Sequence, residues 1–239
     1  MKGALRIVYP PQCLDCGVPV ERDGSLCPTC WRDCEFVGGC ACPACGVPLP
    51  GLADAEEQAP FCDDCLRIER PWRQGRAALV YRGVGRDLVL ALKHGDRPDL
   101  AKPLGQWLGA AVVPLLRPGM VVAPVPLHPR RMLKRKFNQA ALLSAQVARA
   151  HGLVHFPALL RRDRATPAQD HRGHAERHEN LHGAFSVPLR HRQRIAGREV
   201  LVIDDVMASG ATMAEAVRAL RDAGAGAVSV AVLARAVKE

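Results

Sequence analysis

The feature that most restricts how this chain can fold is a series of four Cys-x-x-Cys pairs in its first third. All ten cysteines lie between positions 13 and 65. Eight of them form the pairs Cys13/Cys16, Cys27/Cys30, Cys42/Cys45 and Cys62/Cys65. Each such turn presents two thiolates to one ion, and two turns complete the tetrahedral site that structural zinc requires. Disulfides belong to oxidising compartments, and the opening residues make a poor export signal, so we expect zinc sites instead.

An internal repeat indicates how the pairs combine. Residues 13–20 read CLDCGVPV and residues 42–49 read CPACGVPL, and a second pair follows each after 10 and 16 intervening residues, respectively. The repeat favours two zinc ribbons in tandem, each ion bound by consecutive pairs, over an interleaved pairing. A closed four-ligand site leaves no position for substrate, so both Zn²⁺ ions should be structural. Cys34 and Cys40 are left over; either replaces a neighbour as ligand or, as we expect, they are free thiols.

Charge divides the chain into two parts. Residues 1–70 hold 6 Lys and Arg against 11 Asp and Glu, whereas residues 71–239 hold 27 against 13. This asymmetry predicts two domains, 1–70 and 71–239, joined by a linker around 69–75. A domain with such an excess of positive charge should attract polyanions, either nucleic acid or the phosphates of a small ligand. Without a signal peptide or a run of eighteen apolar residues, we expect a cytoplasmic protein that does not insert into a membrane.

The second part alternates strand-like and helical segments. Strands are predicted at 77–81, 121–126, 153–157, 185–188, 200–204 and 227–233. Helices are predicted at 86–93, 100–116, 138–151 and 212–223. Such alternation is typical of an α/β fold with a mainly parallel sheet flanked by helices. The apolar run VLVI at 200–203 has the character of a central strand, buried on both faces.

Two adjacent carboxylates follow this central strand. Asp204 and Asp205 should lie at its carboxyl edge, where open α/β sheets bind ligands. The next residues form a Gly-containing turn into a helix, and we call residues 208–212 the phosphate loop. Backbone amides at a helix N-terminus, with the Ser209 and Thr212 hydroxyls beside them, suit a phosphate. Carboxylates so close to an anion make sense if they accept hydrogen bonds from sugar hydroxyls.

The segment VLVIDDVMASGAT, residues 200–212, resembles the phosphoribosyl-pyrophosphate (PRPP) motif of type I phosphoribosyltransferases. With the zinc ribbons in front of it, the whole chain resembles the ComF family of competence proteins. Three further segments carry the resemblance: LALKHGDRPDLA at 90–101, APVPLHPRRMLKRKFNQA at 123–140, and the stretch from RATPAQ at 164–169 to GAF at 183–185. The sequence departs from the family at Lys136, where glycine is usual.

The resemblance implies a role for each matching residue. Asp204 and Asp205 would bind the ribose 2′- and 3′-hydroxyls of PRPP, which is bound together with Mg²⁺. The 5′-phosphate would be held by Ala208, Ser209, Gly210, Ala211 and Thr212. The pyrophosphate would lie near Arg130, Arg131 and Arg135. Residues 162–182 would form a mobile loop over the site.

Two other patterns have competing interpretations. Five positive charges within residues 130–136, next to Phe137, would suit either the phosphates and bases of single-stranded nucleic acid or the pyrophosphate alone. Further cationic clusters at 161–164 and 190–198 tilt the balance toward nucleic acid. Histidines recur at helical spacing at positions 171, 174, 178 and 182, and we interpret them as a solvated face or disordered loop rather than a metal stripe.

Three functions follow from these features. The first is a protein of natural transformation that handles incoming single-stranded DNA, together with other DNA-uptake proteins, and binds PRPP. The second is an active phosphoribosyltransferase that uses PRPP and an unidentified acceptor. The third is a scaffold with a relic site, which the intact acids and hydroxyls of residues 204–212 argue against.

Overall fold

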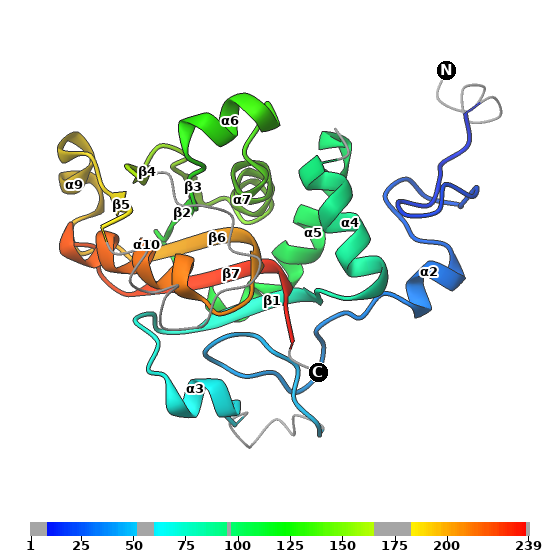
Figure 1. The fold of residues 1–239 in the computed structure, drawn as a ribbon, viewed down its shortest axis with the longest axis horizontal. Coiled ribbons are helices and arrows are strands. Elements are labelled where there is room, and N and C mark those ends of the chain that lie inside the picture. The colour runs from blue at the N-terminus through cyan, green and yellow to red at the C-terminus, as the bar shows by residue number, and fades with distance from the viewer. Residues whose placement is uncertain (1–8, 52–59, 95–96, 165–182, 238–239) are drawn as a thin grey trace.

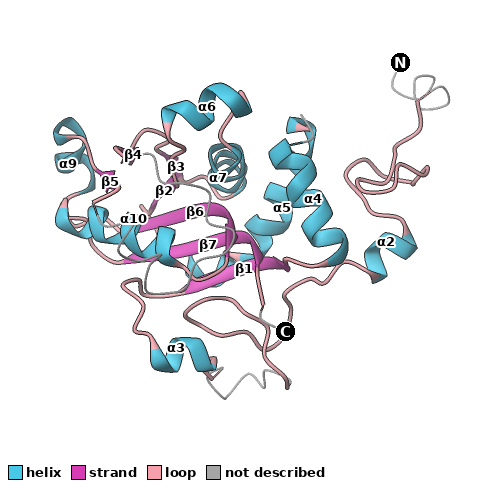
Figure 2. Ribbon diagram, in the orientation of Figure 1, coloured by secondary structure: helices cyan, strands magenta, loops and turns pink. Residues whose placement is uncertain are grey.

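A five-stranded sheet lies at the centre of the computed structural model, which describes residues 9–51, 60–94, 97–164 and 183–237. Its strand order is β1-β7-β6-β2-β3, and each neighbouring pair is parallel. The strands are β1 (Gly75–Val80), β2 (Val121–Pro124), β3 (Val154–His155), β6 (Val200–Met207) and β7 (Val228–Arg235). The predicted α/β class with a mainly parallel sheet is therefore confirmed, and Figure 2 shows the strands side by side.

Helices cover both faces of this sheet. The larger helices are α4 (Gly83–His94), α5 (Ala101–Ala111), α6 (Pro129–Arg135), α7 (Gln139–Ala150), α9 (Leu189–Ile195) and α10 (Ala211–Asp222). Side chains alternate across a strand, so Leu201 and Ile203 of β6 join the core beneath α4, α5 and α7. Val200 and Val202 join the opposite core, beneath α10. β6 is thus buried on both faces, as its apolar run predicts.

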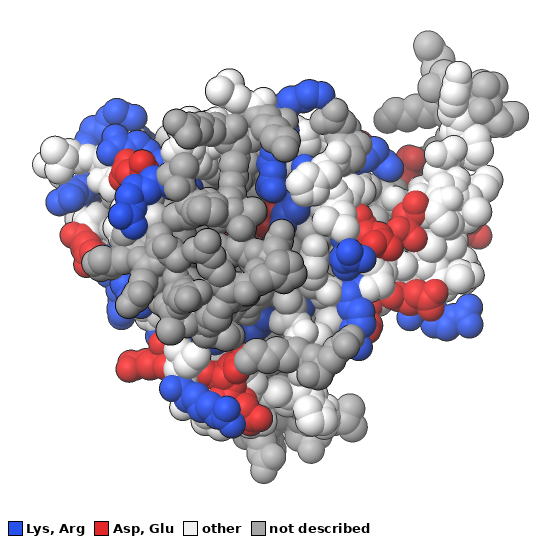
Figure 3. Space-filling view, viewed as in Figure 1, with Lys and Arg blue, Asp and Glu red and all other residues white. Residues whose placement is uncertain are grey.

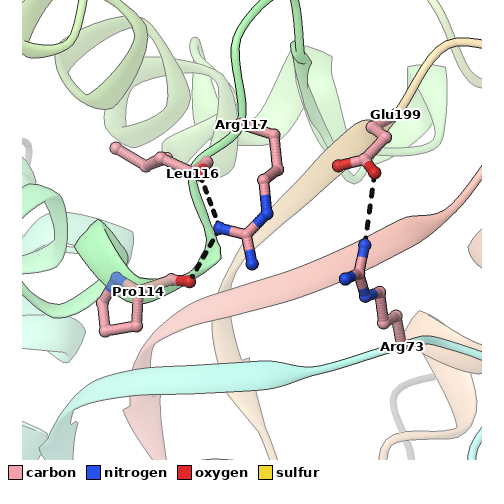
Figure 4. A network of polar contacts seen from close by, with 5 residues as sticks. All are labelled: Arg73, Pro114, Leu116, Arg117 and Glu199. Carbon is pink, nitrogen blue, oxygen red and sulfur yellow. Dashed lines mark hydrogen bonds and ion pairs between the residues drawn. The ribbon is translucent and has the colours of Figure 1, made fainter.

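Several elements differ from the prediction. The strand expected at 185–188 lies outside the parallel sheet, because β5 (Phe185–Ser186) pairs in antiparallel fashion with β4 (Arg161–Arg162). The helix expected at 100–116 is interrupted: α5 is flanked by the 3₁₀ turns η1 (Pro98–Leu100) and η2 (Val113–Leu115). After η2, the Arg117 guanidinium donates to the Pro114 and Leu116 carbonyls at 3.2 and 2.7 Å and closes the turn into β2 (Figure 4). The short helices α6 and α9 were not predicted, because few apolar residues mark them.

The cysteine-rich region packs against the sheet in two places. It contains the short helices α2 (Pro28–Arg32) and α3 (Asp63–Arg67), which flank β1 and α4 in Figure 1. Phe36 forms an antiparallel bridge with Leu79 of β1, and the Val37 amide donates to the Ala78 carbonyl at 2.9 Å. β1 is hydrogen-bonded to β7 on its other side, so both of its edges have backbone partners. The boundary between residues 70 and 71 stays a prediction.

The predicted linker follows a defined path. The Trp72 indole donates to the Ala44 carbonyl at 2.5 Å, and the ring is buried. The Arg73 amide donates to the Val228 carbonyl at 2.8 Å, while its guanidinium pairs with Glu199 at 3.2 Å (Figure 4). These contacts join the residues before β1 to β7 and to the start of β6. Among the described helices, none has the length and apolar character needed to cross a membrane.

Candidate functional site

The eight paired cysteines form two clusters. One contains Cys13, Cys16, Cys27 and Cys30, and the other contains Cys42, Cys45, Cys62 and Cys65. Within each cluster the four sulfur atoms all lie within 4.8 Å of one another. Consecutive pairs therefore combine, as the internal repeat predicts, and the interleaved arrangement is excluded. Four thiolates converging on one point are the donor set of a structural zinc site.

Hydrogen bonds prepare these thiols for a metal. In the first cluster the Cys27 amide donates to Cys13 Sγ at 3.2 Å. In the second, the hydrogen bond between the Cys42 and Cys45 side chains lowers the pKa of Cys42 to about 4 and raises the pKa of Cys45, which burial raises further. These contacts favour a thiolate, the form that binds zinc, at Cys42. Cys34 and Cys40 are buried, lie outside both clusters and form no disulfide.

The strand before the phosphate loop is longer than predicted: β6 continues past the two aspartates and ends directly before residue 208. Asp204 pairs with Val232 of β7, and the ladder ends only at Met207. Gly210 has a left-handed backbone, with φ +83°, and caps α10, which begins at Ala211. The Ser209 hydroxyl accepts from the Ala211 amide at 3.4 Å. The sequence-based strand ended too early because adjacent carboxylates are unusual within a strand.

A cavity of about 320 Å³ lies beside this loop. It is lined by Lys93, Asp204 and the residues from Val206 to Met213. All five predicted phosphate-binding residues, from Ala208 to Thr212, therefore line one cavity together with one of the two acids. Amides at the start of a helix and hydroxyls above a strand end can hold an anion there.

The two aspartates have different surroundings. Asp205 forms an ion pair with Lys93 of α4, with 3.0 Å between Nζ and Oδ1, and both side chains are mostly buried. Asp204 accepts the Asp205 amide at 2.9 Å. Burial and then the neighbouring charge of Asp205 raise the pKa of Asp204 to about 7, against the opposing charges of Lys93 and Arg162. The pair can thus accept hydrogen bonds from a diol, with Asp204 changing its charge near neutral pH.

The predicted pyrophosphate arginines lie on α6, which follows β2, the neighbour of β6. The side chains of Arg130 and Arg131 lie outside what the structure describes. Arg135 is half-buried and does not line the 320 Å³ cavity. Lys136, which stands where the family usually has glycine, has a left-handed backbone with φ +64°. This conformation gives the physical reason for glycine at that position.

The FNQ segment at 137–139 has a structural role. Asn138 caps α7 by accepting the Ala140 amide at 3.0 Å, and its side-chain amide donates to the Val125 carbonyl at 3.0 Å. It therefore ties the start of α7 to the segment after β2. Gln139 is buried and donates to the Lys93 carbonyl at 3.5 Å, which places it behind the lysine that meets Asp205.

Four further residues near the site were not predicted as site residues. Lys93 and the buried Arg162 contribute positive charge close to Asp204. Arg235 and Arg70 contact the backbone of residues 207–209 from outside the cavity. Lys93 gave a signal as part of the stretch 90–101 that carries the family resemblance, and Arg162 gave one as part of the cationic cluster at 161–164 and of the predicted mobile loop. Most of the predicted mobile loop, with the four spaced histidines, lies outside the described residues.

Comparison with known proteins matches two separate parts of the chain to known domains. Residues 4–66 match the double zinc ribbon domain, and residues 161–238 match the phosphoribosyl transferase domain. The "DNA utilization protein YhgH" of Salmonella typhimurium is 30% identical over 236 residues, which cover 96% of this chain and 99% of that protein. "Competence protein F" of Haemophilus influenzae is 27% identical over 232 residues, which cover 94% of this chain and 97% of that protein.

A solved structure matches part of this chain at lower similarity. The glutamine PRPP amidotransferase of B. subtilis, complexed with ADP and GMP, matches with a TM-score of 0.41 and 22% identity. The match covers 60% of this chain and 30% of that one, so this chain spans less than a third of that enzyme.

The class of protein is now defined: a double zinc ribbon followed by a phosphoribosyltransferase-like α/β domain. The chain belongs to the ComF family, since it aligns with relatives of that family over nearly its whole length.

Proposed function

We propose that this protein serves DNA uptake or utilisation and handles single-stranded DNA in the cytoplasm on its basic α/β domain. The observation that carries the proposal is the alignment with DNA utilization and competence proteins over nearly the entire chain. The charge distribution supports it, because residues 71–239 hold 27 Lys and Arg against 13 Asp and Glu. Other DNA-uptake proteins are the partners that this role implies.

The α9 surface is the part of the described domain that best suits a DNA backbone. We define it as the exposed side chains of Arg190, Arg192 and Arg194, which lie on a helix without acidic residues. Arg194 stacks over the Phe156 ring at 4.6 Å, so the aromatic ring holds its position. Figure 3 shows Lys and Arg gathered over α9 at the upper left and acidic side chains around α3 at the lower left. Guanidinium groups spaced along a helix can pair with successive phosphates.

An electrophoretic shift with a labelled single-stranded oligonucleotide tests this role. We expect binding at low salt that weakens steeply as salt rises, because phosphate contacts release counterions. Arg190→Ala, Arg192→Ala and Arg194→Ala together should reduce the slope of log affinity against log salt by about 2. Arg86→Ala, Lys102→Ala and Arg149→Ala remove the same charge from exposed positions on α4, α5 and α7 and serve as the control. Equal losses of affinity in both triple variants would show that net charge, and not the α9 surface, determines binding. If the wild type does not bind the oligonucleotide, the proposed role is excluded.

We also propose that the 320 Å³ cavity binds PRPP with Mg²⁺. Asp204 and Asp205 would accept hydrogen bonds from the ribose hydroxyls, and the phosphate loop would hold the 5′-phosphate. Arg130, Arg131 and Arg135 would meet the pyrophosphate, whose charge Mg²⁺ partly neutralises when bound. What supports the proposal is the joint lining of one cavity by Lys93, Asp204 and the whole phosphate loop.

Calorimetric titration with PRPP and Mg²⁺ tests this site. Wild-type protein should bind, and the Asp204→Ala/Asp205→Ala variant should not. Since the pKa of Asp204 is raised to about 7, its carboxylate is mostly protonated at pH 6 and mostly ionised at pH 8. The ionised form accepts more hydrogen bonds from the diol, so affinity should rise with pH. Asp204→Asn should remove this part of the rise and leave only the part due to PRPP's own phosphates.

The second candidate is an active phosphoribosyltransferase. In that reaction a nucleophilic nitrogen of the acceptor bonds to C1 of PRPP, the bond from C1 to pyrophosphate breaks, and the acceptor gives up a proton. The buried Lys93–Asp205 pair beside Asp204 favours this candidate, because it keeps the acids oriented. Release of pyrophosphate in the presence of nucleobases or amines tests it. If none releases pyrophosphate above the rate of PRPP alone, the site binds without turnover.

A further inference from the structure

Two arginines donate hydrogen bonds to backbone carbonyls at the start of the phosphate loop. Arg235, at the end of β7, is 4% exposed, and one nitrogen of its guanidinium donates to the Met207 and Ala208 carbonyls at 3.0 and 2.7 Å. Arg70, in the linker before β1, donates to the Ser209 carbonyl at 2.8 Å. Three consecutive carbonyls thus meet positive charge supplied by residues distant in the sequence.

This arrangement orients the loop's amides. In a planar trans peptide the carbonyl and the following N–H point in opposite directions. Neither Arg70 nor Arg235 lines the 320 Å³ cavity, so the carbonyls of residues 207–209 point away from it. The N–H groups of Ala208, Ser209 and Gly210 therefore point toward the cavity side. By fixing the carbonyls, Arg70 and Arg235 orient these N–H groups toward an anion in the cavity.

Arg70 also contacts the second cysteine cluster. Its Nε donates to Cys65 Sγ at 3.4 Å, while another nitrogen of the same guanidinium reaches Ser209. The guanidinium lies 5.6 Å from the centre of the Trp72 ring. A Cβ added at Gly210 would lie 3.1 Å from both Arg70 and Trp72, so the loop has no room to relax toward them. The Arg70 guanidinium therefore links a predicted metal ligand, Cys65, to the phosphate loop.

The same side of the loop faces the cluster across a second cavity. This cavity measures about 660 Å³, and its lining includes Cys62, Ala208, Ser209 and Arg235. The first cluster is placed differently. Cys30 donates to the Asp15 carboxylate, and Cys13, Cys27 and Cys30 join the core beneath α4 and α5. The cluster contacts described for the loop thus all come from the second cluster.

We propose that Arg70 is the positioning residue through which the second cysteine cluster holds the phosphate loop in its binding conformation, while Arg235 fixes the preceding carbonyls from β7. Binding of the 5′-phosphate would then depend on metal in the second cluster and not on metal in the first. This inference rests on the proposed binding of PRPP.

The physical basis of this coupling is the hydrogen bond from Arg70 to the Cys65 sulfur. A metal-bound thiolate is a charged acceptor, and hydrogen bonds to ligand atoms both orient the ligand and fix the donor. Without metal, no ion fixes the position of the Cys65 sulfur against the Arg70 guanidinium. Arg70 then loses the contact that holds its second nitrogen against the Ser209 carbonyl. The loop carbonyls become free to turn, and the amides no longer converge.

Arg70→Ala and Arg70→Lys test the coupling, with Arg73→Ala as the matched control. Lysine keeps the charge but has a single nitrogen, which cannot reach Cys65 and Ser209 as the guanidinium does. Arg73 lies three residues further along the same linker, and its guanidinium pairs with Glu199 rather than with the loop (Figure 4). Two measurements are made: hydrogen exchange of the amides of residues 208–213 without ligand, and titration with PRPP and Mg²⁺.

We expect both Arg70 variants to keep two zinc ions per chain, to exchange these amides at least about tenfold faster, and to bind PRPP about 10- to 100-fold more weakly. Arg73→Ala should match the wild type in both measurements. If the Arg70 variants exchange and bind as the wild type does, the coupling is wrong. If the wild type does not bind PRPP, the proposed ligand is wrong, while the exchange measurement still decides the coupling.

Removal of each metal gives the second test. Cys62→Ser/Cys65→Ser and Cys13→Ser/Cys16→Ser should each retain one zinc ion. We expect the first variant to show faster exchange in residues 208–213 and weaker PRPP binding, and the second to retain wild-type values. Equal effects of the two variants, or a larger effect from the first cluster, would overturn the proposal. Circular dichroism confirms that each variant has kept the α/β fold.

Discussion

The two zinc ribbons begin with nearly the same sequence but differ in what they touch. Gly17 and Gly46 occupy the same place in the repeat, and both have left-handed backbones, with φ +76° and +70°. A Cβ at Gly17 would meet nothing within 4 Å, whereas one at Gly46 would lie 2.5 Å from the Ala77 nitrogen of β1. The same metal-binding turn can therefore face open space at its glycine in one copy and lie against β1 in the other.

The largest expected effect separates these two glycines. Gly17→Ala should cost only the strain of a left-handed alanine, about 1–2 kcal/mol. Gly46→Ala adds a clash with the backbone of β1 that cannot relax by side-chain rotation, so we expect a loss of at least about 3 kcal/mol. Chemical denaturation of zinc-loaded protein measures both. Equal losses would show that the docking of the second ribbon contributes little to stability.

Two tryptophans extend the comparison of the two ribbons, with a smaller expected loss of stability. Trp72 is 6% exposed and donates to Ala44 in the second ribbon, whereas Trp31 of the first ribbon is 56% exposed and stacks 4.5 Å from Phe36. Trp72→Phe leaves the buried Ala44 carbonyl without its donor, at a cost of about 1–3 kcal/mol. Trp31→Phe should stay within about 0.5 kcal/mol of the wild type. Thermal unfolding measures the difference, and a larger loss at Trp31 would reverse our assignment of the tighter contact.

The smallest expected effect concerns a left-handed residue that is not glycine. Lys136→Gly should relieve the strain at φ +64° and stabilise the protein by up to about 1 kcal/mol, after the entropy of the added glycine is counted. Urea denaturation provides the measurement, with Lys102→Gly inside α5 as the control that should lose about 1 kcal/mol. A loss at both positions would mean that the Lys136 side chain contributes more than its backbone costs.

Local chemistry was predictable from the sequence, and long-range placement was not. The cysteine pairing follows from an internal repeat, and the phosphate loop follows from a strand, two acids and a glycine turn, all within a few residues. Arg70 and Ser209 are 139 positions apart, and no periodicity or spacing predicts that they meet. Lys93 could be identified as part of a segment, but its pairing with Asp205 depends on α4 reaching the carboxyl edge of β6.

The end of β6 shows the same limit in one strand. An aspartate pair lowers the local preference for a strand, so the sequence predicts an end at residue 204. Pairing with β7 overrides this preference and extends the strand to Met207. The consequence is functional, because successive residues of a strand point to opposite faces. Asp205 thereby reaches Lys93, while Asp204 lines the cavity with the loop.

The contact between Phe36 and β1 has a consequence for truncation of this protein and for exchange of its two parts. An open edge of a parallel sheet offers unpaired amides and carbonyls to any other strand, and natural proteins cover such edges to avoid aggregation. Here the cover for β1 comes from the chain between the two ribbons. A truncated chain that begins at residue 71 would expose this edge together with the apolar surface beneath it. The zinc ribbons thus act as a solubility cap for the α/β domain, and the two parts cannot be exchanged independently without supplying another strand.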